Sequence, residues 1–182
     1  IQRIADLGGD TIRGLMCYSV SEAKFLSQQG FDDLLVAYPH IQRKDVEQSI
    51  EVTKEGKTIT LMVDSPDQAA RLARFCDEMD HTAPLRVCID IDASLKTLGQ
   101  HLGVQRSAVR SIEGLKRLIQ RIQQFPALQL VGAMTYEAQV AGLADTSPHQ
   151  RFINPVIRKI KQKSMRWLLD YRRQIQDTFA DE

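Results

Sequence analysis

The sequence has few cysteines, few aromatic residues and no long apolar run. Cys17, Cys76 and Cys88 are its 3 cysteines, and their wide spacing without a C-x-x-C pair argues against a disulfide framework or a zinc ribbon. No segment approaches the roughly 20 apolar residues of a membrane helix, and the first residues lack the pattern of a secretion signal. We therefore expect a cytoplasmic protein with no membrane partner.

The chain also lacks a strong charge of either sign. Its 182 residues include 24 Lys and Arg against 23 Asp and Glu, which gives a net charge of +1. Eight of the basic and four of the acidic side chains lie in residues 151–182, a distribution typical of a solvated helix face. Without clustered aromatics or Gly-rich loops beside these cations, we expect no nucleic-acid partner.

Short β-branched segments alternate with longer segments of helical period, which predicts parallel strands joined by crossover helices. Polar or acidic residues follow the later strands, and Pro or Gly residues separate strands from helices. The five predicted strands are Ile12–Cys17, Asp33–Tyr38, Thr58–Val63, Leu85–Ile91 and Leu128–Tyr136.

Helix start and stop signals lie between these strands. A helix is expected to begin at Ser19 or Ser21, with Glu22 as the capping-box partner of Ser19, and Gly30 predicts its end. Ser65 followed by Pro66 predicts the start of another helix. The longest helix is expected from about Asn154 toward Thr178.

Two parallel architectures fit this alternation, the doubly wound open sheet and the (β/α)8 barrel. A doubly wound nucleotide fold requires a Gly-rich phosphate turn after its first strand, and neither G-x-G-x-x-G nor G-x-x-x-x-G-K-[ST] is present. In a barrel, polar residues at the carboxyl ends of the strands meet at one active-site mouth. Asp64, Asp92 and Glu137 follow strands in this way, which favours the barrel.

The segment Cys88–Ser94 contains the most informative local chemistry. Alternation along a strand places Asp90 and Asp92 on one side, where two carboxylates repel unless a cation or a shared proton compensates them. Lys96, Arg106 and Arg110 follow closely and are candidate cations. The alternative is that either Asp only caps the next segment. With His101 as the one histidine nearby, we expect no metal site.

An aromatic side chain lies beside a carboxylate at the end of the fifth predicted strand, in Thr135-Tyr136-Glu137. The ring of Tyr136 is suited to stacking on a flat heterocycle. The alternative is a half-buried packing role with the hydroxyl in water, and the residues alone favour that alternative.

The segments CIDIDASLK, HLGVQRS and MTYEAQVAG, in this order and spacing, resemble the alanine-racemase-like family of pyridoxal-phosphate enzymes of fold type III. The subgroup is that of the amino-acid aldolases, racemases and deaminases related to D-threonine aldolase. FDDLLVAYP and LMVDSPDQ resemble the same subgroup.

The resemblance implies an α/β fold, a (β/α)8 TIM barrel with an added β-rich domain, working as a homodimer. On this basis residues 1–182 are a single partial barrel of about five strands, without the first strand, the last two strands and the β-domain. The Schiff-base lysine is expected upstream, so no catalytic residue is expected within this chain. The metal of D-threonine aldolase has no equivalent here.

The resemblance also implies roles for individual residues. Tyr136 matches the position that packs on the cofactor ring, which overturns the packing alternative. Arg106 matches an arginine close to the substrate carboxylate, and a guanidinium suits that planar anion. Asp64, Asp92 and Glu137 are expected to line the pocket.

The resemblance implies that this is the central part of a pyridoxal-phosphate-dependent amino-acid aldolase or racemase, a lyase or an isomerase, acting through an external aldimine. Without the lysine, the isolated chain is expected to be inactive. The alternative is a non-catalytic pyridoxal-phosphate carrier with the same barrel. A different barrel enzyme would need a lysine at a strand end, and Lys57, Lys96 and Lys116 are expected at a strand start, in a loop and within a helix.

Overall fold

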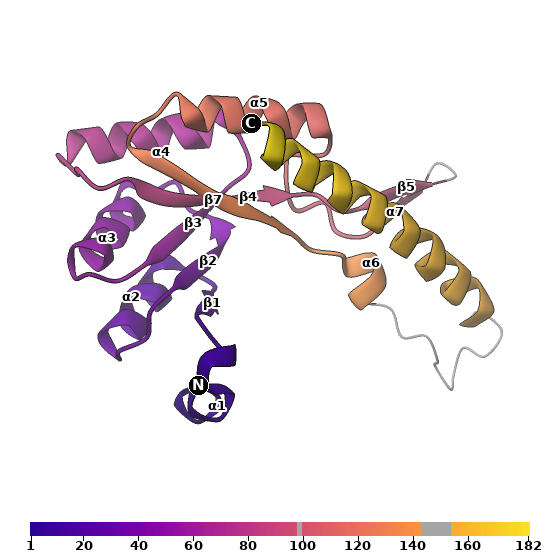
Figure 1. Cartoon of the computed structure of the whole chain (residues 1–182), viewed down its shortest axis with the longest axis horizontal. Helices are drawn as coiled ribbons and strands as arrows, with labels where there is room; N and C mark the ends of the chain where they lie inside the picture. Colours follow the sequence, from indigo (N-terminus) through magenta and orange to yellow (C-terminus); the bar gives the residue numbers. More distant parts are fainter. Residues whose placement is uncertain (98–99, 143–153) are drawn as a thin grey trace. The chain divides into compact units, whose positions relative to one another are not determined.

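The computed structural model describes residues 1–97, 100–142 and 154–182, and its architecture is α/β (Figure 1). The strands are β1 (Leu15–Cys17), β2 (Leu34–Pro39), β3 (Ile59–Val63), β4 (Leu85–Ile91), β5 (Leu95–Thr97), β6 (Gln100–Leu102) and β7 (Leu128–Thr135). The helices are α1 (Gln2–Gly8), η1 (Gly9–Thr11), α2 (Val20–Gln28), α3 (Arg43–Lys54), α4 (Pro66–Glu78), α5 (Ile112–Gln123), α6 (Ala138–Ala141) and α7 (Asn154–Asp181).

Five strands form one sheet in the order β1-β2-β3-β4-β7. The pairs β1–β2, β2–β3 and β3–β4 are parallel. Leu85, which begins β4, donates its backbone N–H to the carbonyl of Ala127, directly before β7, so these two strands start at the same end of the sheet. The sheet is therefore parallel throughout, and the order follows the chain as in a partial (β/α)8 barrel.

Burial explains the composition of the central strands. All five residues of β3 are buried, and six of the seven residues of β4 are buried. Parallel strands that are covered on both faces have nearly continuous apolar sequences, as ITLMV in β3 does. Crossovers of one hand place the connecting helices on one face, and α2 packs beside α3 there.

The predicted helix boundaries are set by local hydrogen bonds. Ser19 and Ser65 are the N-caps of α2 and α4, and each hydroxyl accepts from the backbone N–H three residues later. Gly30, at φ +93°, follows the end of α2, where the N–H of Phe31 donates to the carbonyl of Leu26. This is a Schellman ending, for which glycine has the least steric cost.

The sequence prediction is confirmed for the five strands of the sheet and for the main helices, and it missed short elements. The β5–β6 hairpin and α6 were not predicted. Lys96 was expected in a loop and lies in β5, because Leu95–Thr97 pairs antiparallel with Gln100–Leu102. Three-residue strands are too short to leave a period in the sequence.

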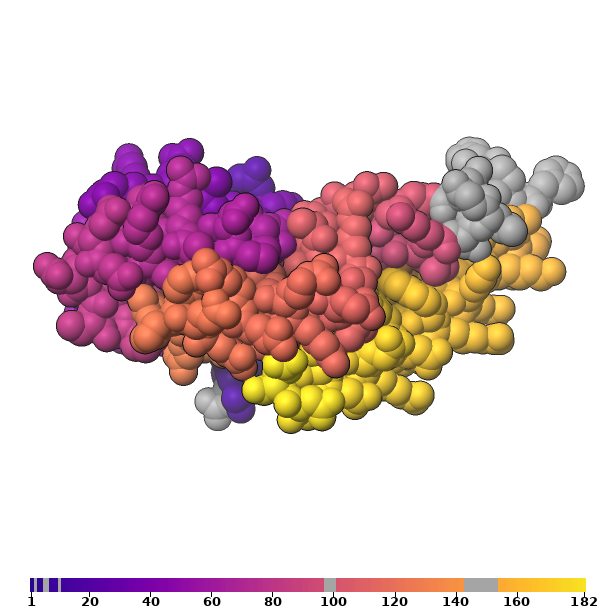
Figure 2. Space-filling model, turned by 90° about the horizontal axis from the view of Figure 1, so that it is seen from above, coloured from indigo at the N-terminus to yellow at the C-terminus, as the bar shows by residue number. Residues whose placement is uncertain are grey.

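Two compact units make up the chain, one of residues 1–89 and 121–132 and the other of residues 90–120 and 133–182. Unit 1 contains the buried faces of α2, α3 and α4, including Val46, Ile50, Leu72 and Cys76. In unit 2 the long helix α7 buries Leu168, Tyr171 and Ile175 at spacings of three and four residues. Figure 2 shows the surface of α7, in light orange to yellow, beside salmon-coloured residues of the same unit.

Candidate functional site

The carboxyl end of β4 contains a buried ion pair. Asp90 Oδ2 accepts from Arg106 Nε at 2.8 Å, and the exposed fractions of the two side chains are 1% and 14%. A carboxylate removed from water needs such a partner, because an uncompensated buried charge costs several kcal/mol. The expectation that a nearby arginine compensates Asp90 is therefore confirmed.

The loop after the hairpin is fastened to the end of β4 by backbone and hydroxyl contacts. Ser107 Oγ donates to the carbonyl of Asp90 at 2.6 Å and accepts from the N–H of Val109 at 3.0 Å. The N–H of Asp92 donates to the carbonyl of Val109 at 2.8 Å. These bonds fix Arg106 and Arg110 on either side of one anchored segment.

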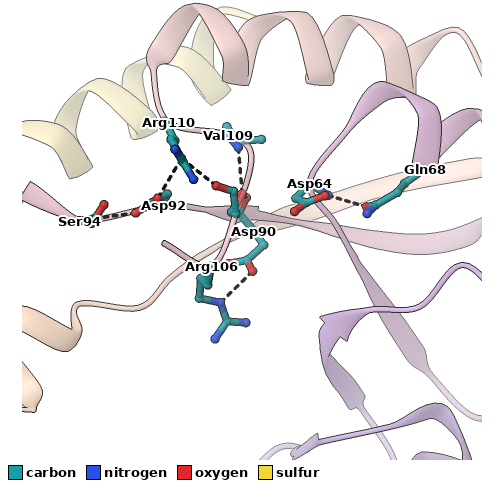
Figure 3. Close-up of polar contacts among 9 residues, drawn as sticks. Asp64, Gln68, Asp90, Asp92, Ser94, Arg106, Val109 and Arg110 are labelled. Atoms are coloured by element: carbon teal, nitrogen blue, oxygen red, sulfur yellow. Dashed lines mark hydrogen bonds and ion pairs between the residues drawn. The ribbon is translucent and has the colours of Figure 1, made fainter. Parts of the chain in front are cut away.

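Asp92 forms a second pair with a different environment. Its Oδ1 accepts from the N–H of Ser94 at 2.8 Å and its Oδ2 lies 3.2 Å from Arg110 Nε (Figure 3). Because β4 ends at Ile91, strand alternation does not fix the direction of the Asp92 side chain. The two carboxylates therefore have different cations, Arg106 for Asp90 and Arg110 for Asp92.

Burial, together with the negative charges of Asp92 and Glu113, raises the pKa of Tyr171.

Tyr136 lies directly after β7 with 45% of its surface exposed. The guanidinium carbon of Arg106 is 6.0 Å from the centre of its ring, within the range of a cation–π contact. The structure therefore brings together two predicted site residues, Tyr136 and Arg106.

Glu137 is held by two partners. Thr135 Oγ1 donates to its Oε1 at 2.8 Å, and Arg172 of α7 forms an ion pair with the same oxygen. The carboxylate of Glu137 thus connects the end of β7 to α7. This connection fixes the backbone next to Tyr136.

Asp64 belongs to unit 1, whereas the other four predicted site residues belong to unit 2. It follows β3 and is half-buried, and its backbone N–H donates to Gln68 Oε1 at 2.9 Å (Figure 3). Its pocket-lining role stays a prediction, as do those of Asp92 and Glu137.

Three residues with structural roles at the site were not found from the sequence. Ser107 and Gln139 are buried, and Gln139 Nε2 donates to the carbonyl of Ala93 at 2.6 Å. Arg172 reaches Glu137 from 35 residues away. The position of Gln139 within YEAQVAG is a signal that could have identified it, whereas the pairing of Arg172 depends on the fold.

The described residues include no group of three or more His, Cys, Asp or Glu side chains placed to hold a metal ion. None of the described helices is both long and apolar enough to cross a membrane. For a flat cofactor ring, the half-exposed ring of Tyr136 offers a stacking face with a guanidinium beside it, so these residues fit one wall of such a site.

Comparison with models of known protein families identifies the family of this chain. The model of the alanine racemase N-terminal domain matches residues 1–169, and the chain belongs to this family, which is a fold type III family of pyridoxal-phosphate enzymes.

Individual relatives are similar over most of this chain. A 3-hydroxy-D-aspartate aldolase of Paracoccus denitrificans strain Pd 1222 is 21% identical over 162 residues, which cover 89% of this chain and 39% of the aldolase. The structure of D-threonine aldolase from Filomicrobium marinum covers 93% of the chain and 42% of its own length, at 19% identity and a TM-score of 0.63. Alanine racemase of Clostridium difficile 630 covers 90% and 40%, at 17% identity and a TM-score of 0.59.

The matches cover only part of each relative. The chain spans about two fifths of the length of the relatives that it matches. At these identities the solved structures establish the partial-barrel fold.

Proposed function

We propose that the protein is a pyridoxal-phosphate-dependent aldolase or racemase acting on an amino acid, and that this chain supplies part of the barrel around the cofactor. The single observation behind this proposal is the pairing of Tyr136 with Arg106 at the carboxyl end of the sheet, in a chain of the alanine racemase N-terminal family. The cofactor would supply the electron sink for the bond that breaks at the α-carbon.

The residues of this chain would bind and orient the reactants. Tyr136 would pack its exposed ring against the cofactor ring. Arg106, oriented by Asp90, would receive the carboxylate of the amino acid through directional hydrogen bonds. Because Asp90 already neutralises much of the guanidinium charge, orientation rather than net charge would be the contribution of Arg106.

No lysine of this chain is expected to form the Schiff base with the cofactor. Lys57 precedes β3, Lys96 lies in the β5–β6 hairpin and Lys116 lies in α5, so none of the three follows a strand of the main sheet. We therefore expect the isolated 182-residue chain to be inactive. Turnover by the isolated chain would contradict this part of the proposal.

The alternative is a pyridoxal-phosphate carrier without catalysis. The names of the matched relatives, an aldolase and a racemase among them, support the enzyme. Incubation of the complete gene product with pyridoxal phosphate and D-3-hydroxyaspartate, D-threonine or D-alanine separates the two. Loss or inversion of one substrate supports the enzyme, and cofactor binding without any turnover supports the carrier.

Kinetic analysis of Arg106→Met in the complete protein tests the substrate contact. Losing a hydrogen bond to a charged group should lower kcat/KM by roughly 10- to 100-fold. The matched control is Arg173→Met, which removes a side chain that is 75% exposed and should leave kcat/KM unchanged. Equal values for wild type and Arg106→Met would contradict the role of Arg106.

A further inference from the structure

A cavity in unit 2 lies beside Arg110, the arginine that pairs with Asp92. Asp92, Ser94, Lys96, His101, Arg110 and Trp167 line a volume of about 240 Å³. At about 30 Å³ per water in the liquid, this volume equals about eight waters, which is enough for a small oxyanion. Asp92 is the one predicted site residue among them, whereas Arg106, Tyr136 and Glu137 do not line this cavity.

The hairpin places two basic side chains together in this cavity. Lys96 of β5 and His101 of β6 are directly opposite partners in the antiparallel pairing. Opposite residues of such a pair project to the same face with their Cβ atoms about 5 Å apart. Lys96 is exposed, so its ammonium is accessible from solvent.

The imidazole of His101 has an unusual environment. Both of its ring nitrogens are buried and neither has a hydrogen-bond partner, although the residue itself is only half-buried. A buried nitrogen without a partner is costly, and such groups in native proteins often face a bound water or ion. The imidazole lines the cavity, so a ligand in the cavity is the natural partner.

The remaining walls set the charge and shape of the ligand. Arg110, with 48% of its side chain exposed, pairs with Asp92 and offsets that carboxylate, which leaves the net charge of the wall positive through Lys96. The indole of Trp167, stacked on Tyr171 with ring centres 5.0 Å apart, adds a flat and rigid side.

We infer that this cavity, which we name the hairpin pocket, binds a small oxyanion, a phosphate or a carboxylate, between Lys96 and His101. Lys96 contributes charge and donors, and His101 donates one ring N–H to an oxygen. This inference does not depend on the proposed function, because neither Lys96 nor His101 has a role in the proposed cofactor and substrate contacts.

Trp167 is the only tryptophan of the chain, so its fluorescence reports on the hairpin pocket alone. Titration with sodium phosphate and with sodium acetate, each against sodium chloride of the same ionic strength, should give a saturable change with at least one of the two anions. Saturation with phosphate alone or with acetate alone identifies the preferred class. Responses to both that are indistinguishable from that to chloride would overturn the inference.

Variants assign the response to its residues. Lys96→Met and His101→Leu should each weaken the apparent affinity roughly tenfold, whereas Lys159→Met, an exposed lysine on the same helix as Trp167, should not change it. An unchanged affinity in both pocket variants would overturn the inference. If His101→Leu does not fold, the affinity of Lys96→Met tests the inference by itself. Lys96 is exposed, so its replacement leaves no cavity in the core.

Discussion

At the scale of single residues, the ion pair of Asp90 and Arg106 combines burial with charge. Arg106→Met leaves the carboxylate of Asp90 in the interior without its cation, so we expect a loss of about 3–5 kcal/mol in the free energy of unfolding. Urea unfolding followed by circular dichroism measures this loss. Adding Asp90→Asn to the variant should restore part of it, because the charge is then gone.

The control for this experiment is the exposed pair of Arg173 and Asp170. These side chains are 75% and 70% exposed and 3.7 Å apart, so Arg173→Met should change the free energy of unfolding by less than about 1 kcal/mol. If Arg106→Met cost no more than Arg173→Met, the Asp90 pair would not be a buried charge pair in solution.

The buried thiols give a second prediction at this scale. Burial raises the pKa of Cys17, with help from Glu22, and of Cys76, with help from Asp77, in both cases to about 11. At pH 8 only about one thiol in a thousand is then ionised, and thiolate is the reactive form. We expect slow labelling by a disulfide reagent in the native protein and rapid labelling in urea. Rapid native labelling of both cysteines would contradict this burial.

The same shifts fix the direction of a pH effect. The unfolded thiols lose their protons near the ordinary pKa of 9.0, and the folded thiols keep them until about 11. Between these values the folded state binds more protons, so the contribution of the two thiols to stability falls as pH rises. Urea midpoints measured from pH 8 to pH 11, with Cys76→Ala for comparison, should show a smaller decline in the variant.

How much of the site could be predicted differs from residue to residue. The compensation of Asp90 and Asp92 by nearby arginines was predictable, because like charges at a strand end require it. The separate pairing with Arg106 and Arg110 was not, since Asp92 lies beyond β4 and its direction depends on the Val109 backbone contact. The pairing of Glu137 with Arg172 was not predictable, because Arg172 comes from the distant helix α7, 35 residues along the chain.

At the scale of elements, the caps have local causes and therefore local tests. Ser65→Ala removes the acceptor for the N–H of Gln68 at the start of α4 and should cost about 1 kcal/mol of unfolding free energy. Ser21→Ala is the control, because Ser21 is an exposed residue of α2 whose hydroxyl contacts Gln48 rather than the helix backbone. Equal losses of unfolding free energy in the two variants would contradict the capping role of Ser65.

Element prediction from the sequence was most accurate where several signals coincide. Leu85–Ile91 was predicted with its observed bounds, since an apolar run lies between Pro84 and a polar segment. The first strand begins at Leu15 rather than Ile12, because η1 and the irregular residues 12–14 precede the pairing with β2. The β5–β6 hairpin depends on cross-strand pairing that no short-range pattern reveals.

At the scale of the whole molecule, the five-stranded sheet has β1 and β7 as its outer strands. Met16 on β1 and Val131 on β7 are 64% and 37% exposed. Open strand edges with apolar side chains promote association between chains. We expect the isolated chain to self-associate, with a mass above 20.6 kDa that rises with concentration in light scattering.

Two charged substitutions test the cause of this association. Met16→Lys and Val131→Lys together should reduce it, whereas Leu7→Lys on α1, equally apolar and 80% exposed, should not. If the chain stays monomeric at every concentration, the outer strands β1 and β7 do not cause association.

We propose that this chain provides the contact with the cofactor ring and that none of its residues is the Schiff-base lysine. The most direct test is to reconstitute the natural protein with pyridoxal phosphate, reduce it with borohydride and map the labelled lysine by mass spectrometry. We predict one stoichiometrically labelled lysine outside the sequence of these 182 residues. A label on a lysine within them, or no labelled lysine in a protein that turns over substrate, would contradict it.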